Sequence, residues 1–307
     1  MLMYMLKRLW QALIVLFIVS LISFTLIRLA PGSPALLMLP PDIATDEQIA
    51  ALEARMGLDR PIPVQFWVYL TNIFRGDLGM STVYQQPVLR IIIQRLPNTV
   101  RLAISTVFVG CLLAIPLGIY AGANRGKIAE FVCMFFALLG QSMSSMWLGI
   151  LLIFLFAVKL GWLPALGTGG IQFMILPVLT MGYPMAASLT RVARSGMVDT
   201  LSEDYITATY AKGIGKFQVY TKYALRNALI PVCTMVGLTL GLNLGGAVVV
   251  ETVFAWTGIG QLMNQSVNAR DYAMVQAMLL ISASLITIIT FVVDIINSFI
   301  DPRLTLN

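Results

Sequence analysis

The side chains of this 307-residue chain that could do covalent or metal chemistry are few. It contains no histidine, which removes imidazole acid–base catalysis, Ser-His-Asp and Cys-His nucleophiles, and the commonest metal ligand. The three cysteines, Cys111, Cys133 and Cys233, lie in or beside apolar stretches without the spacing of a metal site or a disulfide pair. We interpret them as packing residues. With no cluster of carboxylates either, we expect no catalytic site and no metal site, which disfavours an enzyme.

One segment carries a weak phosphate-binding signal. Gly213-Ile214-Gly215-Lys216 looks like the end of a phosphate-binding loop. However, Tyr210 stands where the first glycine would be, and Phe217 replaces the Ser or Thr that would hold magnesium. We therefore expect this chain to bind no ATP and no other cofactor by itself.

The composition indicates that most of the chain forms membrane helices. Hydrophobic residues make up 58% of the chain and charged residues 11%, with a mean hydropathy of +0.86, outside the usual range of soluble domains. A hydrocarbon core of about 30 Å takes roughly 20 apolar residues per helix. Barrel strands would alternate apolar and polar residues, whereas these windows are continuously apolar. We predict an all-α polytopic membrane protein with six transmembrane helices, near residues 9–29, 99–121, 131–158, 171–189, 229–250 and 273–300.

Basic residues in the connecting segments set the orientation. Lys7 and Arg8 precede the first span, Arg125 and Lys127 separate the second from the third, and a third basic group follows the fourth span. These segments, and with them both termini, are predicted to be cytoplasmic. The net charge of +6 is then a topological signature, because the positive residues are shared among inner segments instead of forming one stripe. No nucleic-acid partner is expected.

The chain divides into four parts. Residues 1–30 are the cytoplasmic N-terminus and the first helix, whose apolar run is too long for a signal peptide. Residues 31–98 form a polar, proline-rich extracytoplasmic segment with helical patterns near 45–56 and 63–74. Residues 99–300 carry the other five spans, and 301–307 are a cytoplasmic tail.

The membrane spans lack the charge pattern of a transporter that powers itself from a proton gradient or a voltage. Proton- or voltage-driven transporters usually carry ionisable residues deep in the bilayer. Here Arg28, Lys159, Glu251 and Asp294 lie toward the ends of predicted spans, and no inverted repeat is visible. A self-sufficient secondary transporter or channel is therefore disfavoured, and it stays as the alternative from another class.

The polar segment 195–228, between the fourth and fifth spans, is the most informative part of the chain. Read as a helix, residues 201–212 place a set of apolar and aromatic side chains along one stripe. Gly213 and Gly215 then supply a C-terminal stop. We predict a short surface helix, followed by a second basic helix that enters the fifth span. An ordinary amphipathic loop is the alternative.

The residues of this segment resemble the cytoplasmic loop of ABC importer permeases. Gly213 and Leu225 match that loop's glycine and the leucine twelve positions later. Further motifs are similar to the dipeptide, oligopeptide, glutathione and nickel permease family, over almost the whole chain. The matching stretches are Met56 to Pro61 with Gln65, Gly76 to Ser81, Pro87-Val88, Leu96 to Thr99, Gly161 to Pro164, Leu176-Pro177, Arg191, Arg194, Asp204 to Ile206, Ala211 to Gly213, Ala224 to Pro231, Val250 to Trp256 with Gly258 and Gly260, and Asp271-Tyr272 with Gln276.

This resemblance implies a type I ABC importer transmembrane fold in the bacterial inner membrane. It implies a second, homologous permease as heterodimer partner, two ABC ATPase subunits that bind ATP and Mg, and an extracytoplasmic solute-binding protein. The chain would form half of the pathway for di- or oligopeptides or glutathione-like solutes, and nickel or a metal chelate is the alternative cargo.

The resemblance also assigns a role to the short surface helix. In the family this element is the coupling helix, which docks into a groove on the ATPase. The coupling candidates are Glu203, Asp204, Tyr205, Ala208, Ala211, Lys212 and Gly213. The chain departs from the family over residues 207–210, where an Arg-Thr-Ala-Arg pattern is expected, so its ATPase groove is expected to be less acidic or differently shaped.

Two further sets of residues are singled out. Polar side chains inside spans tend to face the bundle interior or a water-filled cavity, although they can instead bond helix to helix. The pathway-lining candidates are Gln141, Ser142, Ser144, Ser145 and Asn243. By resemblance, residues 31–98 form an extracytoplasmic cap that meets the binding protein, and a solvated lid without partner contact is the alternative. The candidates for contact with the binding protein are Asp59, Asp77, Glu251, Trp256 and Asp271. Finally, glycines four residues apart at 118 and 122, and at 237, 241 and 245, predict close helix packing.

Overall fold

The computed structural model describes residues 2–29, 60–245 and 247–300. Over these residues the chain is mainly helical, and its β-structure is one isolated antiparallel bridge between Met80 and Pro87. The predicted all-α class is confirmed for them. The predicted helix at 45–56 and the candidate Asp59 lie outside the described residues. The helices are α1 (Leu2–Leu29), α4 (Ile62–Phe74), α5 (Val88–Ala123), α6 (Ile128–Ser142), α7 (Ser145–Leu152), a π-helix (Ile153–Lys159), α8 (Ile171–Leu201), α9 (Asp204–Ala211), α10 (Lys216–Gln218), a second π-helix (Val219–Ala224), α11 (Leu225–Ala228), α12 (Ile230–Leu244), α13 (Val248–Val253), α14 (Ile259–Asn268) and α15 (Tyr272–Ile300).

Four of the described helices, α1, α5, α8 and α15, are long and apolar enough to cross a membrane by themselves. Two bent pairs raise the number to six if each pair counts as one span. One pair joins 128–142 to 145–159 with a bend of 100°, and the other joins 216–228 to 230–244 with a bend of 53°. Helix length and composition therefore agree with four to six spans.

The single continuous third span predicted at 131–158 is wrong. The backbone is extended at Met143 and Ser144, with ψ of 131° at both residues, and α7 leaves α6 at a steep angle. Hydropathy did not reveal the break, because it measures how apolar a window is and not its direction. The polar residues that flank the break are the signal that could have indicated it.

The second predicted span starts too late. Helix α5 begins at Val88, so the predicted boundary between residues 98 and 99 falls inside this helix. Its first turns carry Arg90 and Arg95, which lower the hydropathy of the window. One face is nevertheless buried, because Val88, Ile91 and Ile92 pack with residues of α14 and α15.

Helices α5 and α8 form the centre of the bundle. They approach so closely that a Cβ at Gly118 would overlap the Ala193 side chain, and one at Gly122 would lie 2.7 Å from Met197 Cβ. On the other side, a Cβ at Gly237 of α12 would overlap Val293 of α15. The predicted packing role of these glycine repeats is confirmed at these three positions, since only a residue without a side chain fits.

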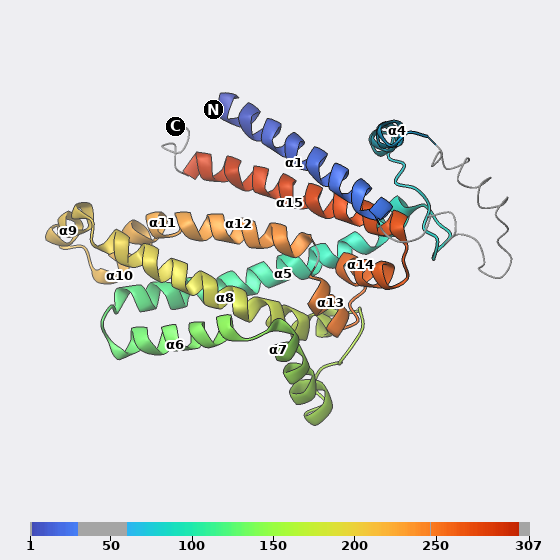
Figure 1. The fold of residues 1–307 in the computed structure, drawn as a ribbon. Coiled ribbons are helices and arrows are strands. Elements are labelled where there is room, and N and C mark those ends of the chain that lie inside the picture. The colour runs from blue at the N-terminus through green and yellow to red at the C-terminus, as the bar shows by residue number, and fades with distance from the viewer. Residues whose placement is uncertain (1, 30–59, 246, 301–307) are drawn as a thin grey trace.

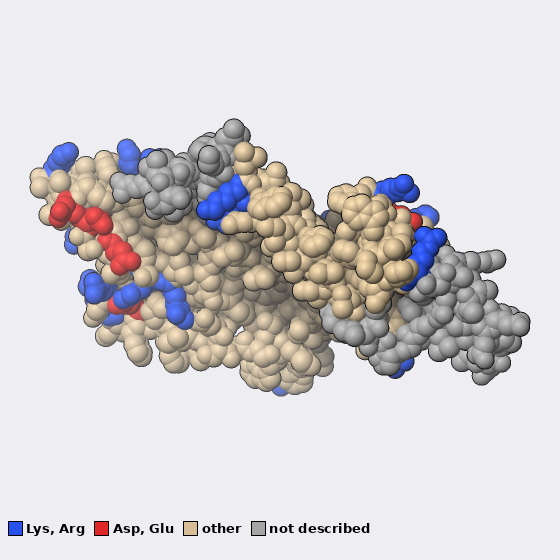
Figure 2. Space-filling view, turned by 45° about the horizontal axis from the view of Figure 1, so that its top comes forward, with Lys and Arg blue, Asp and Glu red and all other residues tan. Residues whose placement is uncertain are grey.

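The two ends of the bundle differ. In Figure 1 the start of α1, the end of α15 and α9 lie toward one end, and α4, α13 and α14 lie toward the other. Arg8 of α1 pairs with Asp294 of α15 at 3.2 Å near the first end. Figure 2 shows charged side chains mostly at the two ends, with a wide uncharged band between them. This distribution suits a protein whose middle is surrounded by lipid.

Candidate functional sites at the two ends of the bundle

The short helix predicted after the fourth span is present as α9. Glu203 precedes it in extended backbone, and Asp204 in its first turn suits the positive end of the helix dipole. The helix ends at Ala211, and Gly213 follows with φ of +78°, where its N–H donates to the Tyr210 carbonyl at 2.9 Å. Because L side chains rarely adopt this φ, Gly213 is the residue that ends the helix. We call residues 202–217 the elbow.

An apolar cluster holds the elbow to the bundle. Ile206 of α9 is buried against Met197 of α8 and against Val219, Ala224 and Ala228, which lead into α12. A polar contact adds to this cluster, because Asn227 Nδ2 donates to the Tyr205 hydroxyl at 2.8 Å. The elbow is therefore fixed both to the end of α8 and to the entry of α12.

The outer face of the elbow is open to solvent. All seven coupling candidates, Glu203, Asp204, Tyr205, Ala208, Ala211, Lys212 and Gly213, are exposed. Phe217 is 81% exposed beside them. Sequence reasoning used Phe217 only to reject a phosphate loop and missed it as a surface residue. An aromatic side chain directly after Lys216 in a polar segment was the available signal.

At the opposite end of the bundle, most of the residues expected to contact a binding protein are buried. Glu251 and Asp271 are fully buried, and Trp256 is 2% exposed, so these three residues offer no surface to a partner in this structure. Asp77 is exposed, and its Oδ1 accepts a hydrogen bond from the Gly79 N–H at 2.9 Å. The sequence placed all of them in outer loops, but it could not show that these loops fold inward on one another.

Glu251 is the centre of a buried hydrogen-bond network. Its Oε1 accepts from the Thr99 hydroxyl at 2.8 Å, and its Oε2 accepts from the Gln261 N–H at 2.9 Å. The Thr99 Oγ1 in turn accepts from the Ile259 N–H at 2.8 Å. Burial raises the pKa of the Glu251 carboxyl, while hydrogen bonds from the Gln261 N–H, Thr99 and the Gly260 N–H act in the opposite direction.

The network extends to neighbouring loops. Asn98 Nδ2 donates to the Thr257 carbonyl at 2.9 Å, and Trp256 Nε1 donates to the Asn98 carbonyl at 3.1 Å. The hydroxyls of Thr168 and Thr257 lie 2.8 Å apart. We call Asn98, Thr99, Thr168 and residues 251–261 the clasp. It joins α5 to the α13–α14 segment and to the loop before α8.

A second buried carboxylate reinforces this end. Asp271 Oδ1 accepts from the Met274 N–H at 3.2 Å, which caps α15, and its Oδ2 accepts from the Ser81 hydroxyl. The loop before α5 is thus attached to the start of α15. Over residues 2–29, 60–245 and 247–300, no group of three or more possible ligands is arranged to hold a metal ion.

The pathway-lining candidates do not form one site. Gln141 accepts a hydrogen bond from Arg191 of α8. Ser142 donates to the Leu138 carbonyl of its own helix at 2.9 Å, which satisfies its hydroxyl locally. Ser144 and Ser145 lie at the break between α6 and α7, and Asn243 lies half-buried on α12. Arg191 was missed, because the predicted fourth span ended at residue 189, whereas α8 continues to Leu201.

Comparison with known proteins agrees with this architecture. Residues 1–103 match the N-terminal model of binding-protein-dependent transport system membrane components. The chain is 41% identical over 304 residues to the glutathione transport system permease protein GsiC of Salmonella choleraesuis, and 40% identical to that of Escherichia coli K12, with 99% of each chain covered. Among solved structures, the inward-facing MetNI methionine ABC transporter aligns with a TM-score of 0.58 at 19% identity, over 69% of this chain and 97% of that one. An amino acid ABC transporter gives a TM-score of 0.52 at 15% identity, over 70% and 94%.

The core of the fold carries the second family match. Residues 114–306, from the last third of α5 to beyond α15, match the model of the binding-protein-dependent transport system inner membrane component. This range includes the elbow and most of the clasp. The two matches together leave only a short stretch of α5 between them. The chain therefore belongs to the family of binding-protein-dependent transport system inner membrane components.

Proposed function

We propose that this chain is one permease subunit of an ATP-driven importer that carries peptides or glutathione-like solutes across the bacterial inner membrane. Its likeness to glutathione permeases over nearly the whole chain supports the solute class. The observation that carries the mechanism is the elbow, an exposed short helix fixed to the ends of two membrane helices. A rigid helix transmits a displacement that a flexible loop would absorb.

In this proposal the elbow docks on an ATPase subunit. Phe217 and Tyr205 offer aromatic surface, and Asp204 and Lys212 offer charges of both signs on the same exposed face. ATP and Mg bind to two ATPase subunits, and this chain holds no cofactor. Nucleotide-driven closure of the ATPases then moves α8 and α12 together, because the elbow is packed against both.

The proposed assembly has six spans with both termini in the cytoplasm. The start of α1, the end of α15 and the elbow share one end of the molecule, which supports this orientation (Figure 1). A second, homologous permease completes the pathway. A solute-binding protein docks at the opposite end, where Asp77 and the exposed Trp67 of α4 are accessible.

The docking role is tested in the assembled transporter with Ala208→Glu and Gly213→Asp. We expect both changes to abolish most of the solute-stimulated ATP hydrolysis, since each places a carboxylate in the docking face. Lys127→Glu is the control, because it alters charge at the same end of the bundle but outside the elbow. If solute-stimulated ATP hydrolysis is unchanged in both elbow variants, the elbow does not couple the permease to the ATPase.

The cargo is tested by uptake of labelled glutathione, a labelled dipeptide and labelled nickel, in cells with and without the gene. Loss of glutathione or dipeptide uptake alone is the expected result. Loss of nickel uptake alone would move the assignment to a metal-chelate importer.

A further inference from the structure

A cavity of about 540 Å³ lies between α6, α8 and α12. Charged and polar side chains line it from two of these helices, together with methionine side chains. The polar lining residues are Glu130 and Gln141 of α6, and Ser188, Arg191, Arg194 and Ser195 of α8. A cavity that is both polar and walled by membrane helices is a place where water or a polar solute can reside.

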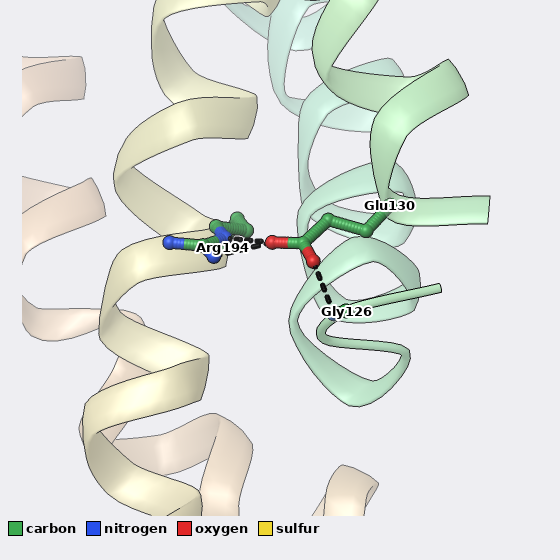
Figure 3. Close-up of polar contacts among 3 residues, drawn as sticks. All are labelled: Gly126, Glu130 and Arg194. Carbon is green, nitrogen blue, oxygen red and sulfur yellow. Dashed lines mark hydrogen bonds and ion pairs between the residues drawn. The ribbon is translucent and has the colours of Figure 1, made fainter. Parts of the chain in front are cut away.

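The positive charge of one of the two arginines is balanced by a carboxylate. Arg194 forms an ion pair with Glu130, and its Nε donates to Glu130 Oε1 at 2.7 Å. The other carboxylate oxygen accepts from the Gly126 N–H at 2.6 Å. Figure 3 shows Glu130 between Arg194 and the turn before α6, with both of its oxygens occupied. This pair joins α6 to α8 near the start of α6.

The positive charge of the other arginine, Arg191, is not balanced by a carboxylate of the described residues. Arg191 donates to the Gln141 amide oxygen, which is a neutral acceptor, and it forms no ion pair with any residue that the structure describes. Its side chain is exposed to the cavity. Since Glu130 is matched by Arg194, the lining carries a net charge of +1 that comes from Arg191.

The position of this charge is unusual. Gln141 lies in the last turn of α6, about 16 Å beyond Glu130 along the helix axis at 1.5 Å per residue. A lone arginine in a membrane helix normally extends its side chain toward the nearest water–lipid interface. Arg191 instead reaches away from the Glu130 end, toward the break between α6 and α7. A charged side chain at this depth of a membrane helix is rare, so a role beyond packing is indicated.

From this geometry we propose that Arg191 binds a carboxylate group of the transported solute within the cavity. A guanidinium presents a planar fork of N–H donors that matches a carboxylate with two parallel hydrogen bonds. Gln141 holds the fork toward the cavity, and the Arg194–Glu130 pair keeps Glu130 from competing for it. The site rests on the proposed import function and narrows the cargo to solutes with a free carboxylate.

The test uses the purified transporter with all its partner subunits except the solute-binding protein. The three native cysteines are replaced by alanine, and Ser195→Cys supplies a single thiol in the cavity lining. The rate of maleimide labelling is measured with millimolar alanyl-alanine or its C-terminal amide. We expect alanyl-alanine to slow the labelling several-fold, and the amide to leave it unchanged.

Substitutions of the arginine sharpen the result. Arg191→Gln should raise the protecting concentration of alanyl-alanine by about tenfold or more, as expected for the loss of a charge-assisted hydrogen bond. Arg191→Lys should give an intermediate value, because it keeps the charge without the fork. Arg125→Gln, which removes a positive charge from an exposed turn, is the matched control and should behave as the parent.

Three results would overturn the proposal. They are equal protection by acid and amide, no protection by either, and protection that survives Arg191→Gln. Loss of the second permease from the Arg191→Gln complex would also overturn it, since Arg191 would then be the partner of a carboxylate across the permease interface. Failure of the import function itself is recognised separately, as absent ATP-driven uptake by the parent complex with its binding protein.

Discussion

The elbow and the clasp use similar residues in opposite ways. Both contain acidic and aromatic side chains, and the sequence marked both as contact surfaces. In the elbow an apolar cluster lies underneath and the acidic and aromatic residues face solvent. In the clasp Glu251 and Trp256 are inside, where they hold loops together. Residue type therefore does not distinguish a docking surface from an internal fastening, and burial does.

The largest effect is expected in the clasp. Glu251→Ala leaves the Thr99 hydroxyl and the Gln261 N–H without their acceptor in a buried site, which should destabilise the fold by about 3 kcal/mol. The thermal transition of the purified transporter would measure this loss. Asp77→Ala at the exposed position should change stability by less than about 0.5 kcal/mol. Similar behaviour of the two variants would contradict the distinction between a buried clasp and a surface.

A smaller and more local effect is expected from the elbow's apolar support. Ile206→Ala removes a buried side chain from the cluster, which should cost about 2 kcal/mol, the low end for such truncations, because the cluster lies at one end of the bundle. We expect hydrogen exchange to become faster in α9 alone, and the stimulation of ATP hydrolysis to become weaker. The exposed neighbour Thr207→Ala serves as control. Exchange that spreads through α5 and α8 would show that the elbow is not a local unit.

The helix end offers a matched pair of glycines. Neither Gly213 nor Gly215 has any atom within 4 Å of where a Cβ would lie, but Gly213 has φ of +78° and Gly215 has φ of −65°. Gly213→Ala should therefore cost about 1 kcal/mol through backbone strain alone, and Gly215→Ala almost nothing. Comparison of thermal stability and of coupled ATP hydrolysis checks this. Equal costs would mean that the turn is not held in this conformation.

The smallest effect is expected at the exposed hydrogen bond. Tyr205→Phe removes the hydroxyl that accepts from Asn227, at a cost of about 0.5 kcal/mol because water can replace it. In a double-mutant cycle, Asn227→Ala should add little once Tyr205 is changed. A fully additive pair would show that this contact does not help to fix the elbow.

Much of the fold could be read from hydropathy and glycine spacing. Long apolar windows predicted α1 and α15, and the glycine repeats predicted close helix packing, although not which helices would meet. Two features could not be read in this way. Helix α5 starts early because one face of a polar stretch is buried by distant residues, and the α6–α7 break depends on backbone dihedrals at Met143 and Ser144.

The candidate sites followed the same rule. The elbow was predictable because its helix and its glycine stop are local in sequence, and the residues named there are exposed. The clasp was not, because most of its hydrogen bonds join residues far apart in the sequence, such as Thr99 and Glu251, which are 152 positions apart. Arg191 and Gln141 are likewise 50 residues apart, and only packing of α6 on α8 brings them together.

The close approach of α5 and α8 has a mechanical consequence. At Gly118 and Gly122 the backbone of α5 approaches α8 so closely that a Cβ would not fit. We therefore expect the two helices to move together as one rod, about 54 Å long for the 36 residues of α5. The elbow is attached to one end of this rod and Thr99 joins the clasp toward the other. A displacement of the elbow would therefore be transmitted along α5 and α8 and would strain the hydrogen bonds of Glu251 at the opposite end.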